Sequence, residues 1–321
     1  MKVSIALTTY NGAAYLQAQL NSYLVQERLP DELVVCDDVS TDETVTILEA
    51  FKKTAPFQVR VIINELNLGF TKNFEKALLN CSGDLVFLSD QDDVWYPEKI
   101  LVVVKAFLQN PDKYLLIHDG DLVDENLVSH GATKRGQVVK GYGSDKHLIT
   151  GALTVIHKNL IQYSLPIPTK IIGHDGWLHS MAKLLNKRLV IDQSLQQIRR
   201  HTKNTSDWIA SSVRPINKFS VLRSQLSSKA SNSYQDRLKY NLSLVLRLRE
   251  LASIEYVDIS IVVISASLKQ LEKEHKAIIH REELFQLSFI NKRIKAIRML
   301  VGGDYAYFNG SKSFLRDMFR Y

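Results

Sequence analysis

The chain has 321 residues, of which 45% are hydrophobic and 23% are charged, the balance of an ordinary folded protein. This composition excludes a mainly disordered, collagen-like or coiled-coil chain, and the length predicts one large domain with an appendage or two domains. The two cysteines lack the spacing of a zinc site, exclude a disulfide scaffold and fit a reducing cytosol.

The charge is distributed unevenly along the chain. Residues 1–198 hold 19 Lys+Arg and 23 Asp+Glu (net −4), whereas residues 199–321 hold 22 and 11 (net +11). The basic C-terminal third predicts an anionic partner there, such as phosphate, nucleic acid or a membrane surface. We expect no secretory signal in MKVSIALTTY and no membrane span, because the longest apolar run, 259–268, is too short to cross a bilayer.

Apolar strand candidates alternate with helix-like segments in the first half of the chain. The predicted strands are Val3–Leu7, Leu33–Cys36, Val59–Ile63 and Leu85–Leu88, and the predicted helices span about 15–24, 44–51, 71–79 and 100–107. This alternation predicts an α/β fold with a mostly parallel central sheet flanked by helices. Strand signals weaken after 114 and fade near 205, so we predict a first domain at 1–205 and a basic helical C-terminal region at 206–321.

Polar clusters follow each of the four predicted strands. They are Thr8–Gly12, Asp37–Asp42, Asn64–Gly69 and Ser89–Asp93. The carboxyl ends of parallel strands meet at one edge of a sheet, where ligands bind, so we expect these clusters to converge. Neither GxGxxG nor GxxxxGK[ST] occurs, and the usual phosphate-binding loops are therefore absent.

The fourth cluster is a set of three carboxylates, Asp90, Asp92 and Asp93. Three carboxylates at close quarters stay ionised only beside a cation, and hard carboxylate oxygens with no neighbouring histidine or cysteine favour Mg²⁺ or Mn²⁺. An isolated D-x-D triplet is more often a solvated loop, and the same spacing recurs at 119–121. The position of Asp90, directly after an apolar strand, favours the metal site.

Four segments occur in a distinctive order: TTYNG, VVCDDVSTDET, NLGFTKNFEKAL and GDLVFLSDQDDVWYPEKI. Together they resemble the family 2 inverting glycosyltransferases, which have the nucleotide-sugar-binding GT-A fold. The resemblance covers about residues 1–205. The segments SDQDDVW, GHDGWL and RRHTKN are most similar to the rhamnosyltransferase-like branch that builds bacterial surface polysaccharides.

The resemblance implies roles for individual residues. The donor-binding residues would be Thr8, Tyr10, Asn11, Asp37, Asp38, Asn67, Gly69, Asn73, Asp90 and Arg199. Asp92 and His201 would hold the metal ion, Mg²⁺ or Mn²⁺, and Asp175 would be the catalytic base. The family usually has glycine where this chain has Val39, and a β-branched residue resists positive φ. The turn after Asp38 is therefore expected to differ from the family or to be held differently.

Several of these residues are also explained by a purely structural role, and that alternative stays open. Asp37 and Asp38 are also explained as an acidic pair favoured by a helix N-terminus. Asn67 and Gly69 are also explained as turn residues, and His201 as a loop histidine.

The resemblance implies an inverting glycosyltransferase that moves a sugar from a nucleotide-diphosphate donor, dTDP-rhamnose or a UDP-sugar. The acceptor would be a hydroxyl of a bacterial surface-polysaccharide glycan or lipid-linked glycan, at the cytoplasmic face of the membrane. The implied mechanism is a metal-assisted single displacement with Asp175 as base. One alternative is a non-catalytic nucleotide-sugar-binding or scaffold subunit of a polysaccharide assembly complex. Another is a sugar nucleotidyltransferase, which usually needs a basic Gly-rich loop that TTYNGAAYL lacks.

The C-terminal region contains basic amphipathic segments. Ile290, Ile294, Ile297 and Val301 share one helical face, and lysines and arginines lie around it. These apolar stripes pack on the catalytic domain or on a second subunit in a homodimer, or they make peripheral contact with an anionic membrane. We expect no nucleic-acid partner, because no recognised module is present.

Overall fold

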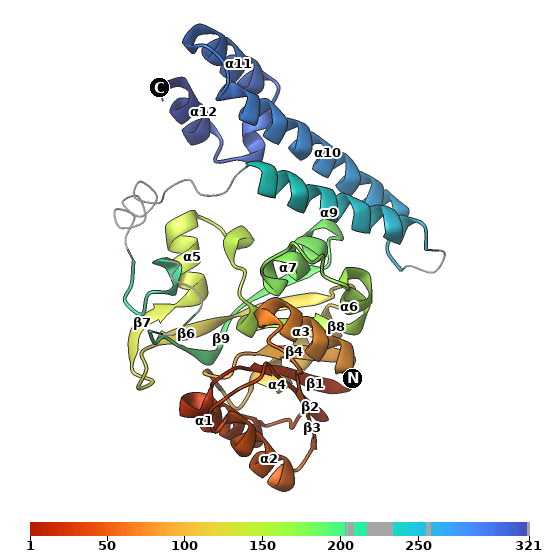
Figure 1. Cartoon of the computed structure of the whole chain (residues 1–321), viewed down its shortest axis with the longest axis vertical. Helices are drawn as coiled ribbons and strands as arrows, with labels where there is room; N and C mark the ends of the chain where they lie inside the picture. Colours follow the sequence, from red (N-terminus) through yellow and green to blue (C-terminus); the bar gives the residue numbers. More distant parts are fainter. Residues whose placement is uncertain (203, 205–208, 217–233, 255–257, 320–321) are drawn as a thin grey trace. The chain divides into compact units, whose positions relative to one another are not determined.

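The computed structural model of the protein describes residues 1–202, 204, 209–216, 234–254 and 258–319. The chain divides into two compact units, Met1–Ser227 and Ser228–Tyr321 (Figure 1). The domain boundary predicted at residue 205 falls on residues outside the described part and stays a prediction.

The first unit alternates strands and helices as predicted. In chain order it contains β1 (Val3–Thr9), α1 (Ala13–Leu24), β2 (Glu32–Asp37), α2 (Thr44–Thr54), β3 (Gln58–Ile63), α3 (Gly69–Asn80), β4 (Leu85–Ser89), β5 (Val94–Trp95), α4 (Lys99–Gln109), β6 (Leu115–Val123), β7 (Ser129–Thr133), α5 (Lys134–Tyr142), η1 (Asp145–His147), η2 (Gly151–Leu153), β8 (Thr154–His157), α6 (Lys158–Ser164), α7 (His174–Leu184), β9 (Arg188–Arg199) and η3 (Ile209–Ser211). The four strands and four helices predicted in the first half are confirmed.

In the described residues the strands form one sheet in the order β3-β2-β1-β4-β8-β6-β9-β5, with β7 paired to β6. The pairs β1–β2, β2–β3, β1–β4 and β6–β9 are parallel. The pairs β4–β8, β6–β8, β6–β7 and β5–β9 are antiparallel. The parallel pairs are the longer ones, so the predicted α/β fold with a mostly parallel central sheet is confirmed, with shorter antiparallel pairs added to it. Two of the antiparallel pairs arise because β8, from a stretch with weak strand signals, enters between β4 and β6.

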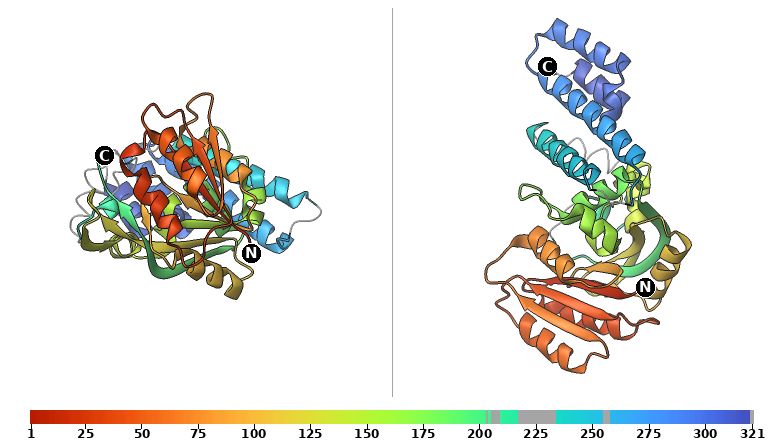
Figure 2. Two further views of the ribbon diagram at one scale, coloured as in Figure 1. Left: turned by 90° about the horizontal axis from the view of Figure 1, so that it is seen from below. Right: turned by 90° about the vertical axis from the view of Figure 1, so that its right-hand side faces the viewer.

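Helices cover both faces of the parallel half of this sheet. Val3, Ile5 and Leu7 alternate along β1 and form one core with buried side chains of α1, α2 and α4. Helix α3 packs on the other face of β1 and β2, where Phe74 is buried (Figure 1). Figure 2 shows the same layers from two further sides. This packing fixes the strands, so that the loops after β1, β2 and β4 meet at one edge.

The second unit is helical, as predicted. It contains α9 (Tyr234–Ala252), α10 (Ile261–Leu284), α11 (Phe289–Val301), η4 (Asp304–Tyr307) and α12 (Ser311–Phe319). A small core of Leu284, Ala296, Met299 and Tyr305 joins α10, α11 and η4. None of the helices in the described ranges is both long and apolar enough to cross a membrane.

Candidate active site

A side-chain amide joins the loops that follow β1 and β4. The backbone N–H of Tyr10 donates to Gln91 Oε1 at 2.9 Å, and Gln91 Nε2 donates to the Tyr10 carbonyl at 3.0 Å. A Cβ added to Gly12 would overlap the amide group of Gln91, so the pairing needs a glycine there. The exposed Tyr10 ring stands at this edge, and Thr8 is partly buried at the end of β1.

Further hydrogen bonds join the loops that follow β1 and β2. Asn11, at φ 47°, donates its backbone N–H to Ser40 Oγ at 2.9 Å. Its Oδ1 accepts from the Thr41 N–H at 2.8 Å. With the Gln91 amide, these bonds hold the three loops together as one rim. The parallel register of β1 with β2 and β4 brings the ends of these three strands together, as predicted for the polar clusters that follow them.

Asp37 is fully buried at the end of β2. Its carboxylate accepts hydrogen bonds from Thr9 Oγ1 at 2.7 Å, the Ser40 N–H at 2.8 Å and Ser40 Oγ at 2.6 Å. Val39, between them, adopts φ 68° despite its β-branched side chain. The turn therefore has the left-handed conformation that glycine would adopt without strain, and the two bonds from Ser40 hold it.

Asp38 is buried and holds the loop between β3 and α3. Its carboxylate accepts from Asn64 Nδ2 at 2.8 Å, the Leu68 N–H at 2.8 Å and the Gly69 N–H at 2.9 Å. Gly69 has φ 75°, a conformation that favours glycine. These bonds use the Asp38 carboxylate within the protein, at the N-terminal end of α3.

Asn67 and Asn73 lie at the same junction. Asn67 Nδ2 donates to the Asp38 carbonyl at 3.2 Å. Asn73 is buried, donates to the Cys36 carbonyl at 2.9 Å and accepts from Asn64 Nδ2 at 2.9 Å. Both amides thereby tie α3 and its preceding loop to the end of β2.

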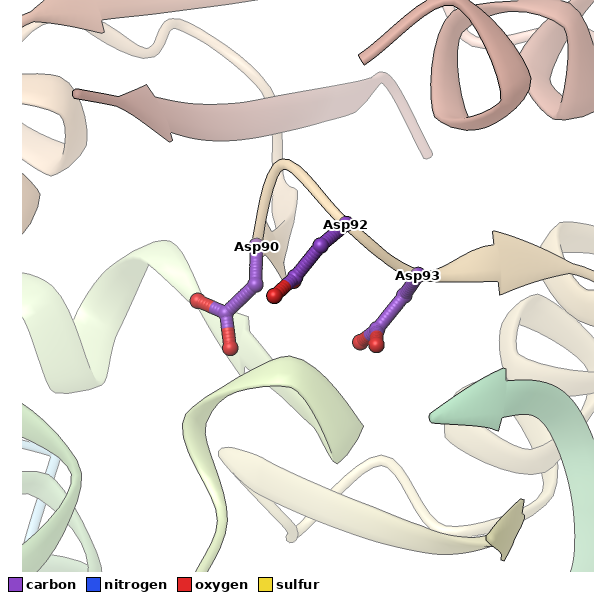
Figure 3. Close-up of side chains that lie close together, drawn as sticks. All are labelled: Asp90, Asp92 and Asp93. Atoms are coloured by element: carbon purple, nitrogen blue, oxygen red, sulfur yellow. The ribbon is translucent and has the colours of Figure 1, made fainter. Parts of the chain in front are cut away.

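The carboxylates of Asp90, Asp92 and Asp93 point to the same side of the loop between β4 and β5 (Figure 3). One ligand oxygen from each lies within 4.8 Å of the others. Asp93 accepts from Gln196 Nε2 at 2.8 Å and from the Arg199 N–H at 3.1 Å, so it fastens the loop to β9. No hydrogen bond of the Asp90 carboxylate is found within the described part of the chain.

Negative charge at this loop is only partly compensated. Burial and, after it, the charges of Asp92 and Asp175 raise the pKa of Asp90 to about 7, while the charge of Lys99 acts in the opposite direction. Burial, together with Asp92 and Asp90, also raises the pKa of Asp93 well above its usual range. Crowded carboxylates of this kind favour a bound cation.

Asp92 and His201 face each other across this loop. His201 Nε2 lies 2.8 Å from Asp92 Oδ2, and Asn204 Nδ2 donates to the same oxygen at 3.1 Å. The His201 ring stacks on Tyr15 of α1, with ring centroids 4.6 Å apart. The structure thus brings together the two residues predicted as metal ligands, with a side-chain arrangement that fixes the imidazole.

Arg199 contacts the acidic loop, the loop between β4 and β5 that carries Asp90, Asp92 and Asp93. Its Nε donates to the Asp92 carbonyl at 2.8 Å, and its Nη1 donates to the Glu125 carbonyl. The guanidinium also lies over the Tyr15 ring, 4.8 Å from its centroid. These contacts occupy the guanidinium with protein groups and brace the position of Asp92.

Asp175 lies in the first turn of α7 and accepts from the Gly176 N–H at 2.8 Å. Its charge is one of the causes that raise the pKa of Asp90. The start of α7 is fixed by a hydrogen bond from the Gly173 N–H to Thr71 Oγ1 of α3, at 2.9 Å. The neighbouring His174 is buried and stacks on Phe74 at 3.9 Å, and its burial lowers its pKa to about 4.

Sequence reasoning missed Lys99, the first residue of α4. Its side chain is fully buried; Nζ donates to Gln196 Oε1 and lies 3.7 Å from the centroid of the Trp95 ring. Burial lowers its pKa well below the usual range, while Asp93 and Asp90 act in the opposite direction. Nothing in the local sequence separates this lysine from a solvated one, because its partner Gln196 lies 97 residues away.

Comparisons with known proteins agree with this geometry. Residues 4–135 match the model of Glycosyl transferase family 2. The chain is 26% identical over 217 residues to dTDP-rhamnosyl transferase RfbG of Shigella flexneri, across 62% of this chain and 72% of that protein. It is 31% identical over 159 residues to UDP-Glc:alpha-D-GlcNAc-diphosphoundecaprenol beta-1,3-glucosyltransferase WfgD of Escherichia coli, across 48% and 59%.

A solved structure shows a similar fold. TarS 1-349 of S. aureus, in complex with UDP-GlcNAc, matches with a TM-score of 0.57 at 18% identity, over 99% of this chain and 82% of that chain. Residues 4–135 thus match glycosyl transferase family 2, and the protein is a glycosyltransferase with the GT-A fold.

Proposed function

We propose that the protein transfers a sugar, with inversion, from a nucleotide-diphosphate donor to a hydroxyl of a bacterial polysaccharide acceptor. The observation that carries the proposal is the pairing of Asp92 with His201 beside Asp90, near Asp175 and at the rim formed by three loops. The names of RfbG and WfgD, which describe sugar transfer from dTDP and UDP donors, add support.

The residues at the acidic loop fit a divalent metal ion, Mg²⁺ or Mn²⁺. Asp92 Oδ2 and His201 Nε2 already face each other at 2.8 Å, and Asp90 adds a carboxylate without a hydrogen-bond partner among the described residues. The uncompensated negative charge, visible in the raised pKa of Asp90, is what a cation would neutralise. When bound, such an ion stabilises negative charge on the diphosphate that leaves the donor.

The three-loop rim provides the proposed donor site. Thr8, Tyr10 and Asn11 would line the base and ribose, and Asp37 would accept a hydrogen bond from the imide N–H of the base. Asp38, Asn67, Gly69 and Asn73 would hold the wall of this site in place through their mutual hydrogen bonds. Thymine and uracil both carry an imide N–H that could donate to Asp37, so dTDP-rhamnose and UDP-sugars are both proposed donors.

Asp175 is the proposed general base. A carboxylate beside the reacting centre deprotonates the acceptor hydroxyl as that oxygen attacks the anomeric carbon. The bond to the diphosphate breaks on the opposite face, through a transition state with oxocarbenium character, so a single displacement inverts the anomeric centre. Arg199 contributes by keeping Asp92 in position.

The proposed acceptor is a glycan linked to a membrane lipid, at the cytoplasmic face of the membrane. Support comes from WfgD, whose name describes transfer to a sugar on diphosphoundecaprenol. The scaffold alternative predicts donor binding without turnover, and the assay below distinguishes it.

Release of nucleotide diphosphate tests the proposal. The full chain is incubated with Mn²⁺, synthetic lipid-diphosphate-linked sugars, and dTDP-rhamnose or UDP-hexoses. We expect release with one donor, and a fall of about 10²- to 10⁴-fold in kcat for Asp175→Asn with donor affinity retained. Asp112→Asn, which changes an exposed carboxylate, is the matched control and is expected to leave kcat unchanged. Equal rates in Asp175→Asn and the wild type would refute the assigned base.

A further inference from the structure

Helix α11 carries large apolar side chains on its exposed face in addition to the apolar residues that it packs into the core. Its buried side chains are Lys292, Ala296 and Met299. The opposite face carries an exposed apolar stripe formed by Ile290, Ile294, Ile297 and Val301. The exposed fractions reach 69% at Ile290 and 84% at Val301. A helix whose outer face only contacts water would not be expected to expose three isoleucines there while it buries a lysine.

Basic residues border this apolar stripe. At about 100° per residue, Arg293 projects beside one edge of the stripe and Arg298 beside the other. Arg293 stacks on the ring of Phe289 at 3.7 Å, which places a cation next to an exposed aromatic side chain. Apolar side chains flanked by cations are the pattern of a helix that lies in the interface of an anionic bilayer.

The positive charge is concentrated on this helix. Helix α11 contains four lysines and arginines and no acidic residue. The preceding α10 contains four basic and four acidic residues, so it is balanced. Of the four, Arg293 and Arg298 flank the exposed apolar face, whereas Lys292 is buried on the opposite face and Lys295 pairs with Glu283 of α10.

Helix α12, which packs against α11, repeats the pattern. Its buried polar residue Asp317 pairs with Arg281 of α10 at 2.8 Å. Its exposed side carries Leu315 and Phe319, and Lys312 and Arg316 lie on the same side at helical spacing. A second helix in the same unit thus turns large apolar side chains outward among cations.

We propose that the apolar stripe of α11 docks the protein on an anionic lipid surface, with the aliphatic side chains in the interface and the flanking arginines at lipid phosphates. A second copy of the chain fits this face less well, because pairing two α11 stripes would bring Arg293 and Arg298 of one copy against those of the other. The proposal depends on the helical unit alone and does not require that the assigned transferase chemistry be correct.

Vesicle co-sedimentation of the full chain tests the proposal without a turnover readout. Vesicles contain phosphatidylcholine with 30% phosphatidylglycerol, or phosphatidylcholine alone. We expect at least tenfold tighter binding to the anionic vesicles, and weakening in 0.5 M NaCl because salt screens the arginines. Ile290→Ser/Ile297→Ser is expected to lower binding at least tenfold. Leu246→Ser, at an exposed leucine of α9, is the matched control and is expected to bind like the wild type.

Circular dichroism verifies that each variant is folded, and light scattering gives its oligomeric state. Folded wild-type protein that fails to sediment with anionic vesicles would overturn the proposal. A wild-type dimer that becomes monomeric in Ile290→Ser/Ile297→Ser would overturn it too, because the face would then be a protein interface. Unchanged vesicle binding in Ile290→Ser/Ile297→Ser would assign membrane contact to another surface and contradict the role of α11.

Discussion

At the residue scale, Val39 carries backbone strain beside the proposed base-binding carboxylate. A β-branched residue at φ 68° is an outlier, and such conformations cost about 1–3 kcal/mol. The hydrogen bonds of Ser40 to Asp37 keep the turn in this conformation. The turn geometry is thus set by its surroundings and not by the local preference of valine.

Val39→Gly is therefore expected to stabilise the protein. Relief of the strained φ outweighs the extra backbone entropy of glycine, and we expect a net gain of about 0.5–1 kcal/mol in the free energy of unfolding. Urea denaturation measures it, and Val39→Ala, which keeps an L side chain at positive φ, should gain less. A lower urea midpoint for Val39→Gly than for the wild type would show that the valine side chain contributes more than its strain costs.

Asp90 predicts a pH dependence of stability in the metal-free protein. Its pKa, about 7 in the folded state, lies above the unfolded value of 3.8, so the folded state holds the proton more tightly. The stabilising contribution of the protonated carboxyl is complete below about pH 4 and is lost as the pH rises to about 7. Unfolding free energies measured between pH 4 and 8 should fall more steeply in the wild type than in Asp90→Asn.

Metal binding is expected to strengthen as the pH rises, because protons compete with the cation for the same carboxylates. Saturating Mn²⁺ should therefore remove most of the difference between wild type and Asp90→Asn in their pH profiles at neutral pH. Parallel profiles for the two proteins without metal would mean that Asp90 titrates at its ordinary pKa.

At the scale of elements, the loops after β1 and β4 act as one unit through the Gln91 amide. Gly12→Ala would displace this amide and lose both hydrogen bonds to Tyr10. We expect the affinity for the donor nucleotide to fall about fivefold to tenfold, because Tyr10 and Asn11 lose their fixed positions. Titration calorimetry measures the affinity.

Gln91→Ala is the matched partner of this substitution, since it removes the same two bonds from the other loop. The double variant should bind the nucleotide no more weakly than either single variant, as expected for residues of one interaction. Strictly additive losses would indicate that Gly12 and Gln91 affect the nucleotide independently.

Most of the strands and helices of the first unit, and the loops between them, were predictable from the sequence. Apolar runs such as Val3–Leu7 and helical spacing such as Leu16 and Leu20 identify the strands and helices, because local patterning and burial agree there. The polar loops at the strand ends follow from the parallel order of β1, β2 and β4. The antiparallel entry of β8 was not predictable, since it depends on pairing between segments about 70 residues apart.

The site was predictable only in part, for a related reason. Asp92 and His201 stand out as residue types, yet their 2.8 Å approach depends on a contact across 109 residues. The burial of Lys99 and the use of Asp38 to hold a loop are likewise products of packing. A pattern of residue types does not distinguish a carboxylate that binds a ligand from one that accepts three hydrogen bonds from the protein.

At the scale of the whole molecule, the chain joins a glycosyltransferase unit, of which residues 4–135 match glycosyl transferase family 2, to a basic helical unit with exposed apolar faces. The first unit provides the proposed chemistry, and the second provides the proposed attachment to a lipid surface. Because a lipid-linked acceptor is confined to that surface, attachment would raise the effective concentration of the acceptor at the enzyme.

Asp92 and His201 are proposed to hold a divalent metal ion together with a nucleotide-diphosphate donor. Thermal unfolding of the full chain with UDP or dTDP, with and without Mn²⁺, tests it most directly, because a ligand that binds the folded state raises the midpoint. We predict a rise with one of the two nucleotides that requires Mn²⁺, and its loss in Asp92→Asn while Asp112→Asn responds like the wild type. An equal rise with and without Mn²⁺, or an undiminished rise in Asp92→Asn, would contradict the metal site.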